Sequence, residues 1–220
     1  MDRSAEPRAL PRFVAISPPD AAAAGGHPFL RALHRALEGA LPGLLLRLPG
    51  VEDAAVLDLG RRVVELLDRA ESRPWFAVHD RPHLAVALGA DAVHLGHRSL
   101  PAERVKQSFG LRVGVSLHRG DAAPDPSHAD YAFLGPLRPS PSKPEGSPAR
   151  RPPLCEEEWR RAREDSALAL FALGGVRVED VPRLRSWGLH GVAAISGVFG
   201  APDPAEAAEA YLRALEGRRP

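Results

Sequence analysis

Cysteine is almost absent from this chain of 220 residues, which contains only Cys155. A single cysteine excludes a disulfide bond within the chain and is typical of a protein from a reducing compartment. Cys155 follows two prolines, where we expect it in the first turn of a helix with no chemical role.

Long apolar runs are also missing. No segment approaches the roughly 18 consecutive apolar residues of a membrane-spanning helix. Residues 1–12 lack the apolar core of a signal peptide, and we expect them to form a flexible arm before one folded domain, residues 13–220. These absences predict a cytoplasmic protein without a membrane partner.

Strong net charge is the third absence. The formal net charge is +1, and no strongly basic face is expected, so nucleic acid is not a predicted partner. The apolar fraction, 44%, and the length suit a protein with one sizeable core.

Short apolar segments recur along the chain, and amphipathic segments separate most of them. The apolar segments begin near residues 13, 44, 75, 92, 112, 131, 168 and 191. An average spacing of about 25 residues predicts an α/β fold, a single (β/α)8 TIM barrel. A doubly wound open sheet is the alternative, but its glycine-rich first turn is missing from FVAISPPD, residues 13–20.

Two connections depart from the regular repeat. Residues 119–129 hold two prolines and few large apolar side chains, so helix five is expected to be degenerate or absent. After strand six comes a long proline-rich loop, Gly135–Pro153. Loops of this length in compact domains are often lids or binding loops.

Small residues end the last two predicted strands. Strand seven runs into Gly174-Gly175, and strand eight runs into Ser196-Gly197. Backbone N–H groups at such turns can face an anion, and TIM barrels often bind phosphate after strands seven and eight. These four residues are therefore predicted to bind a phosphate group.

Polar side chains gather at the other strand ends, where a TIM barrel places its active site. They include Arg47, His79, Asp80, Ser99, Ser116 and His118, with Lys143 in the long loop. The imidazole of His118 can move protons in both directions, or it can simply bond a neighbouring loop. Arg47 needs an anionic partner, either a substrate or a protein acid such as Asp80.

Four histidines raise the question of a metal site. His79 and His83 are four residues apart, and His94 and His97 are three apart, near adjoining strand ends. Four imidazoles could thus converge on zinc. Strand alternation can turn His94 away from His97, however, and such spacings arise by chance, so chance spacing is the favoured explanation.

Several segments together resemble the thiamine phosphate synthase/TenI superfamily. They are DAVHLG (91–96), GVSLH (114–118), ADYAFLGPLRPSPSK (129–143), ALGGV (172–176) and GVAAISGVF (191–199), in family order and at near-family spacing. The resemblance covers about residues 13–216 and implies a TIM barrel. It implies one of two activities in thiamine biosynthesis: a synthase that joins hydroxymethylpyrimidine diphosphate to thiazole phosphate with Mg²⁺, or a metal-independent thiazole tautomerase.

The synthase pattern is only partly kept. Its strand-two motif Gln-Leu-Arg-x-Lys is represented by Arg47, with Leu45 and Pro49 in place of the glutamine and lysine. Its Asn-Asp after strand three is His79-Asp80, and its second metal-binding aspartate after strand four is replaced by Ser99. Because these groups are missing, we expect weaker binding of a diphosphate and its magnesium ion.

The lid of the synthase, Thr-x-Thr-Lys-Lys, reads Ser140-Pro141-Ser142-Lys143-Pro144 and keeps its hydroxyls and one lysine. The resemblance implies substrate binding by a shared set of residues, Arg47, His79, Ser116, Ser140, Ser142 and Lys143.

The favoured hypothesis is a TenI-like tautomerase without a cofactor. In it a small phosphorylated thiazole is the substrate, and His118 removes and returns a proton, as the resemblance implies. The alternative is a divergent thiamine phosphate synthase that binds Mg²⁺ through Asp80. A third hypothesis is a non-catalytic protein that binds thiazole phosphate. A homo-oligomer is compatible with each of them.

Overall fold

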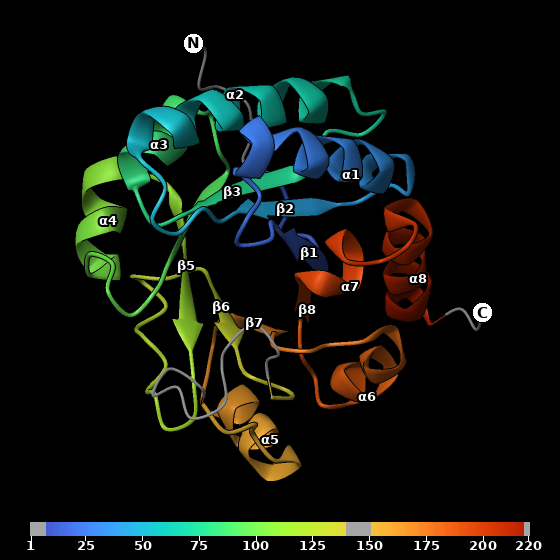
Figure 1. Cartoon of the computed structure of the whole chain (residues 1–220). Helices are drawn as coiled ribbons and strands as arrows, with labels where there is room; N and C mark the ends of the chain where they lie inside the picture. Colours follow the sequence, from blue (N-terminus) through green and yellow to red (C-terminus); the bar gives the residue numbers. More distant parts are fainter. Residues whose placement is uncertain (1–7, 140–150, 218–220) are drawn as a thin grey trace.

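A closed barrel of parallel strands forms the centre of the molecule (Figure 1). The computed structural model describes residues 8–139 and 151–217. Within these ranges the strands pair in sequence order from β1 to β8, and β1 pairs with β8 to close the barrel. The predicted TIM-barrel architecture is confirmed, and the open doubly wound sheet is excluded.

The strands lie where the apolar segments predict them. They are β1 Phe13–Ile16, β2 Gly43–Leu46, β3 Trp75–His79, β4 Ala92–Leu95, β5 Arg112–Leu117, β6 Tyr131–Leu134, β7 Ala169–Ala172 and β8 Gly191–Ala194. The α-helices are α1 His27–Glu38, α2 Asp53–Arg69, α3 Pro82–Ala87, α4 Ala102–Phe109, α5 Glu156–Glu164, α6 Val181–Ser186, α7 Ser196–Phe199 and α8 Pro204–Glu216.

Two short 3₁₀ helices, η1 Ala23–Gly26 and η2 Val178–Asp180, complete the described elements. The connection from β5 to β6 contains no helix, as its two prolines predict. The apolar spacing of Val181 and Leu184 predicts one helix over residues 178–187, and the structure instead divides this segment into η2 and α6. Pro182 lies in the first turn of α6, where a missing N–H costs no helical hydrogen bond.

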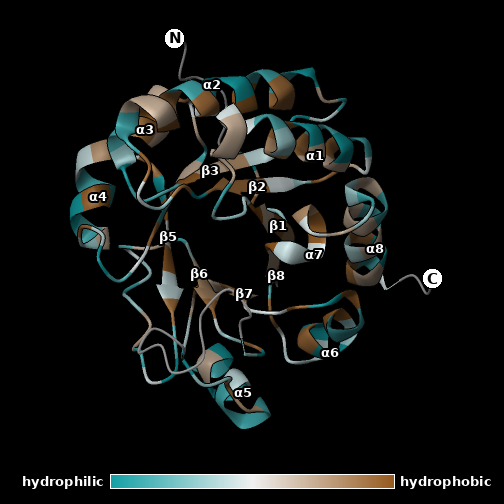
Figure 2. Ribbon diagram, in the orientation of Figure 1, coloured by the Kyte–Doolittle hydropathy of each residue, from teal (hydrophilic) through white to brown (hydrophobic). Residues whose placement is uncertain are grey.

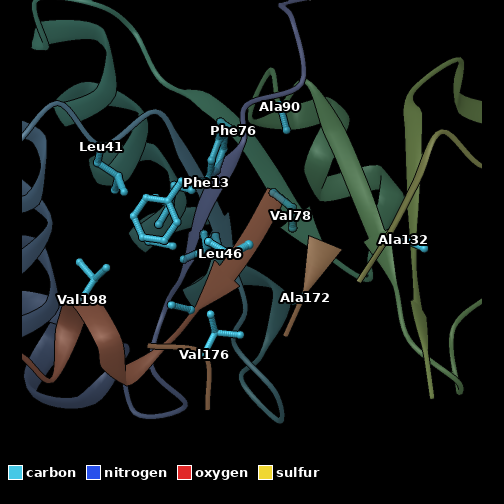
Figure 3. Close-up of a cluster of buried hydrophobic side chains, with 14 of the residues drawn as sticks. Phe13, Leu41, Leu46, Phe76, Val78, Ala90, Ala132, Ala172, Val176 and Val198 are labelled. Atoms are coloured by element: carbon cyan, nitrogen blue, oxygen red, sulfur yellow. The ribbon is translucent and has the colours of Figure 1, made fainter. Parts of the chain in front are cut away.

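The main hydrophobic core lies between the barrel and its helices. Alternate strand residues such as Phe13, Leu46, Phe76 and Val78 point outward and are buried against apolar helix faces (Figure 3). The helices carry their hydrophilic residues on the opposite faces, as Figure 2 shows for α1, α2 and α5. Burial on both sides explains why the strands read as continuous apolar runs.

A second apolar cluster fills the inside of the barrel. Tyr131 lies there against Trp75, with ring centroids 5.6 Å apart, and its aromatic ring crosses the backbone at Gly114. A Cβ atom at position 114 would lie 2.1 Å from Cζ of Tyr131, so only glycine fits on β5 at this point. The barrel interior is therefore filled by side chains below its mouth.

The chain before β1 contacts the barrel over its described part. Arg8 forms an ion pair with Asp91, N to O 2.8 Å, and the Arg12 carbonyl accepts a hydrogen bond from Val192 N–H. Residues 1–7 of the expected flexible arm lie outside the described residues. None of the helices in residues 8–139 and 151–217 has the length and apolar character that crossing a bilayer requires.

Candidate active site

Inward-pointing side chains at the carboxyl ends of β2 to β5 form one half of the barrel mouth. Leu45 points into the barrel, so strand alternation turns Arg47 the same way. His79 on β3 lies beside His94 on β4, and the Nε2 atom of His94 is 3.0 Å from the Ser116 hydroxyl on β5. Of the predicted substrate-binding residues, the structure thus places Arg47, His79 and Ser116 in a single row.

Arg47 is the cation of this row. Its backbone is held by the buried hydroxyl of Ser17, which accepts the Arg47 N–H at 2.7 Å and donates to the Arg47 carbonyl at 3.0 Å. The side chain is half-buried, and burial lowers the pKa of its guanidinium. Among the described residues it forms no ion pair, so the predicted pairing with Asp80 does not occur.

His79 is held neutral at physiological pH. Burial, with a further contribution from the charge of Arg47, lowers the pKa of its imidazole to about 4. His94 is fully buried, and burial followed by His79 and Arg47 lowers its pKa well below the usual value. Both rings therefore offer hydrogen bonds without adding positive charge to the mouth.

Asp80 supplies the carboxylate at this end of the barrel. Its backbone takes a left-handed conformation, φ +57°, and its N–H donates to the His94 carbonyl at 2.8 Å. Its carboxylate makes no ion pair with any residue of the described ranges. Ser99, which replaces the second carboxylate of the family pattern, accepts the Gly96 N–H at 2.9 Å.

The predicted phosphate-binding residues lie at the other half of the mouth. Gly174 and Gly175 both have positive φ, +91° and +67°, directly after β7. Ser196 and Gly197 form the first turn of α7, directly after β8. In the described part of the chain, the N–H groups of these four residues donate to no backbone or side-chain acceptor. Neighbouring β7 and β8 bring the two turns side by side.

An ion pair fixes the loop that forms this phosphate-binding turn. Arg138, after β6, binds Asp180 through two guanidinium nitrogens and also donates to the Gly175 carbonyl at 3.0 Å. Burial alone would raise the pKa of Asp180, but hydrogen bonds from Arg138 and from the Arg177 N–H lower it. The turn after β7 is thus attached to the loop after β6.

His118 lies after β5 in a cluster that the sequence does not reveal. Its Nδ1 atom is 2.6 Å from Nε2 of His97, and Oδ2 of Asp121 lies 3.5 Å from the His97 nitrogen and 3.6 Å from the His118 nitrogen. Asp121 is absent from the predicted site. The signal that could have identified it is the turn from His118 to Asp121, together with the neighbouring positions of β4 and β5.

A cavity of about 250 Å³ adjoins this cluster. Its wall includes His97 and Ser99 after β4, Ser116 and Leu117 of β5, and Pro124. A small ligand can therefore reach the region between the ends of β4 and β5.

The four histidines considered as a zinc site do not converge. His83 is exposed and lies 2.9 Å from a carboxylate oxygen of Asp53, while His94 is enclosed in the barrel. His97 pairs with His118 instead. The predicted lid residues Ser140, Ser142 and Lys143 lie outside the described residues, so their roles stay predictions.

Together, the barrel and its mouth define a TIM-barrel protein with a half-buried arginine after β2 and two glycine-containing turns, after β7 and β8, at the carboxyl ends of its strands. The family model described as thiamine monophosphate synthase (TMP-TENI) matches residues 13–198. The chain belongs to this family.

Curated relatives support the same assignment. The thiamine-phosphate synthase of Roseiflexus castenholzii is 36% identical over 201 residues, which cover 89% of this chain and 83% of the relative. The thiamine-phosphate synthase of Thermus thermophilus is 34% identical over 185 residues, 83% and 87% of the two chains. A solved thiamine phosphate pyrophosphorylase from Pyrococcus furiosus shares the fold, with a TM-score of 0.77 and 23% identity over 94% of this chain and 96% of that chain.

Proposed function

We propose that this chain is a transferase of thiamine biosynthesis, a thiamine-phosphate synthase that joins hydroxymethylpyrimidine diphosphate to thiazole phosphate. The sequence alone puts the tautomerase first, whereas the relatives that carry an enzyme name favour the synthase. The observation that carries the proposal is Arg47, a half-buried guanidinium with no ion-pair partner in the described residues. A diphosphate is the anion best suited to it, because guanidinium binds phosphate oxygens in pairs.

The two substrates would occupy opposite halves of the mouth. The thiazole phosphate would accept hydrogen bonds from the N–H groups of Gly174, Gly175, Ser196 and Gly197. The pyrimidine diphosphate would lie across the ends of β2 to β5, where Arg47 binds its phosphate oxygens. Neutral His79 and the Ser116 hydroxyl would hold the organic part by hydrogen bonds.

Magnesium fits this arrangement through Asp80. Mg²⁺ is usually held by one or two carboxylates, while substrate phosphates and water complete its coordination. Asp80 offers such a carboxylate, free of ion pairs in the described ranges, and the substrate supplies the phosphate oxygens. When bound, the ion supplies neutralisation of the negative charge on the diphosphate.

The chain's own residues then account for the transfer. Arg47 would stabilise the diphosphate as it leaves, since no acidic side chain in residues 8–139 and 151–217 neutralises its charge. The turns after β7 and β8 would hold the thiazole phosphate beside the diphosphate. The reaction between two molecules then becomes a reaction within one bound complex. Leu45 and Pro49 offer no group to the diphosphate, so its binding depends on Arg47 more than the family pattern implies.

A second candidate, the thiazole tautomerase, is favoured by the position of His118. Its ring lies at the mouth beside His97 and Asp121, in reach of the cavity between β4 and β5. An imidazole there can take a proton from a bound thiazole and return it to another carbon. The two candidates differ in their need for the pyrimidine diphosphate and Mg²⁺.

Substitution of Arg47 tests the proposal. In Arg47→Met the diphosphate loses its charge-assisted hydrogen bonds, which are worth about 1.5–3 kcal/mol, so the KM for the pyrimidine diphosphate should rise by about 10- to 100-fold. Steady-state kinetics of thiamine phosphate formation measure this. Arg104→Met, on the exposed surface of α4, is the matched control and should leave the KM unchanged. Equal KM values in both variants would refute the role of Arg47.

A further inference from the structure

His97, His118 and Asp121 form a three-residue cluster outside the row from Arg47 to Ser116. One nitrogen of each imidazole and one carboxylate oxygen of Asp121 lie within 4.8 Å of one another. Among the described residues, this is the group of three potential metal ligands that lie so close together. We propose that this cluster binds a divalent transition-metal ion of the zinc class. The site is separate from the magnesium position at Asp80 and stands whether or not the proposed synthase activity is correct.

The distances suit a small ion with nitrogen and oxygen ligands. Around tetrahedral zinc, with metal–ligand distances near 2.0–2.1 Å, ligand atoms are about 3.3 Å apart. Oδ2 of Asp121 lies 3.5 Å from Nε2 of His97 and 3.6 Å from Nδ1 of His118. The two imidazole nitrogens, at 2.6 Å, share a hydrogen bond and would have to separate by about 0.7 Å to hold the ion. The side chain of His97 is 48% exposed, which leaves it room to make this movement.

The chain holds the ligands in place before an ion arrives. The backbone N–H of His118 donates to Oδ2 of Asp121 at 2.8 Å, and the Asp121 N–H donates to the His118 carbonyl at 3.1 Å. This turn fixes the carboxylate beside the ring. Pairing of β4 with β5, Leu95 opposite Val115, keeps His97 close to His118. Such supporting bonds are typical of built metal sites.

The donor set selects the kind of ion. Two imidazoles and one carboxylate suit zinc, copper or nickel, whereas magnesium prefers oxygen ligands alone. Two arginines are adjacent in sequence to the ligands: Arg119 is neutralised by two hydrogen bonds to Glu158, and Arg98, after His97, is exposed to solvent. The adjoining cavity, lined by His97, Leu117 and Ala122, has room for a fourth ligand such as water. Three protein ligands with an open fourth position are the pattern of accessible zinc sites.

A bound ion would have two consequences. It would tie the loop after β4 to the loop after β5 across the edge of the cavity. It would also occupy the Nδ1 lone pair of His118, so that this atom could no longer accept a proton.

Calorimetric titration of the metal-free protein with ZnCl₂ in the presence of excess Mg²⁺ tests the site. We expect one Zn²⁺ per chain, with affinity reduced at least about tenfold in each of His97→Ala, His118→Ala and Asp121→Asn, since even outer partners of a metal contribute that much. His83→Ala removes an exposed histidine that also lies beside an aspartate, and should bind zinc as the unsubstituted protein does. The absence of zinc binding, or full affinity in any one of the three ligand variants, would overturn the proposal.

Thermal unfolding gives a second readout that does not depend on activity. At a Zn²⁺ concentration 100 times the dissociation constant, the Tm should rise by about 5–10 °C in the unsubstituted protein and in His83→Ala. The three ligand variants should show a rise at most about half as large, because a site at least tenfold weaker gains no more than about 1.4 kcal/mol at the same zinc concentration. An equal rise in the ligand variants would show that zinc acts elsewhere and would overturn the site.

Discussion

The residue that best explains the electrostatics of the mouth is Arg47. Its charge is half-buried, faces His79 and contributes to lowering the pKa of that ring. A protein that had no use for an anion here would be expected to pair or replace such a group, because a buried unpaired charge is costly. The proposed phosphate ligand would offset this cost.

His79 should make stability depend on pH. Its folded-state pKa, about 4, lies below the ordinary value of 6.5, so between these pH values the unfolded chain binds a proton that the folded chain does not. The contribution of His79 to the free energy of unfolding should therefore fall as pH drops from about 6.5 to about 4, by at most about 3 kcal/mol. Above pH 7 this contribution should not change with pH.

Urea unfolding of the protein and of His79→Gln at pH 7 and pH 4.5 measures this effect. The variant should lose less stability on acidification, since only His94 and His190, whose pKa values burial also lowers, then contribute histidine shifts in the same direction. His34→Gln, at an exposed position of α1, should lose as much stability between pH 7 and pH 4.5 as the unsubstituted protein does. Parallel losses in all three proteins would contradict the explanation.

At the scale of elements, the predicted phosphate-binding turn after β7 depends on close contact between the loops after β6 and β7. A Cβ atom at Gly174 would lie 2.6 Å from Cβ of Pro136 and 2.7 Å from its Cα, and φ is +91°. Space and backbone conformation therefore both require glycine.

Gly174→Ala should lower the free energy of unfolding by about 2–3 kcal/mol and weaken binding of thiazole phosphate, because the turn must move away from Pro136. The matched control is Gly110→Ala at the end of α4, where φ is +62° but no atom lies within 4 Å of the added Cβ. It should cost only about 1 kcal/mol and leave binding intact. Urea unfolding and calorimetry measure the two effects, and equal losses in both variants would argue against the contact.

The elements themselves follow from local sequence signals. Strands buried on both faces are largely apolar, so β6 can be predicted to the residue, as can β4 although His94 interrupts its apolar run, and Pro and Gly mark most of the ends. The division of residues 178–187 into η2 and α6 could not be predicted. It depends on Asp180, whose buried carboxylate binds Arg138 from a distant loop.

For the molecule as a whole, barrel closure determines which parts of the site can be predicted. Residues at the ends of strands, such as Arg47, His79 and Ser116, follow from alternation once the barrel is assumed. The cluster of His97, His118 and Asp121 could not be found that way, because its members lie in loops whose paths are set by tertiary contacts. Spacing in the sequence also suggests a shared site for His83 and His94, because it does not show that His83 is exposed beside Asp53 while His94 is buried in the barrel.

The choice between synthase and tautomerase is a property of the complete mouth. The predicted phosphate-binding turns after β7 and β8 would serve either reaction, so they do not distinguish the two. Asp80 would be useful to a synthase, because it can bind the magnesium ion of a diphosphate, whereas a tautomerase has no diphosphate to hold. Arg47 could bind the diphosphate in a synthase or the carboxylate of the thiazole substrate in a tautomerase.

The most direct test is formation of thiamine phosphate by the purified protein from hydroxymethylpyrimidine diphosphate and thiazole phosphate, followed by chromatography. We predict product with Mg²⁺, none with EDTA, and a rate about 100-fold lower in Asp80→Asn, which keeps the shape of the side chain but removes its charge. Absence of thiamine phosphate under all conditions would contradict the synthase. Turnover of a thiazole carboxylate phosphate without Mg²⁺ would then identify the tautomerase, and binding without either reaction would identify a non-catalytic protein.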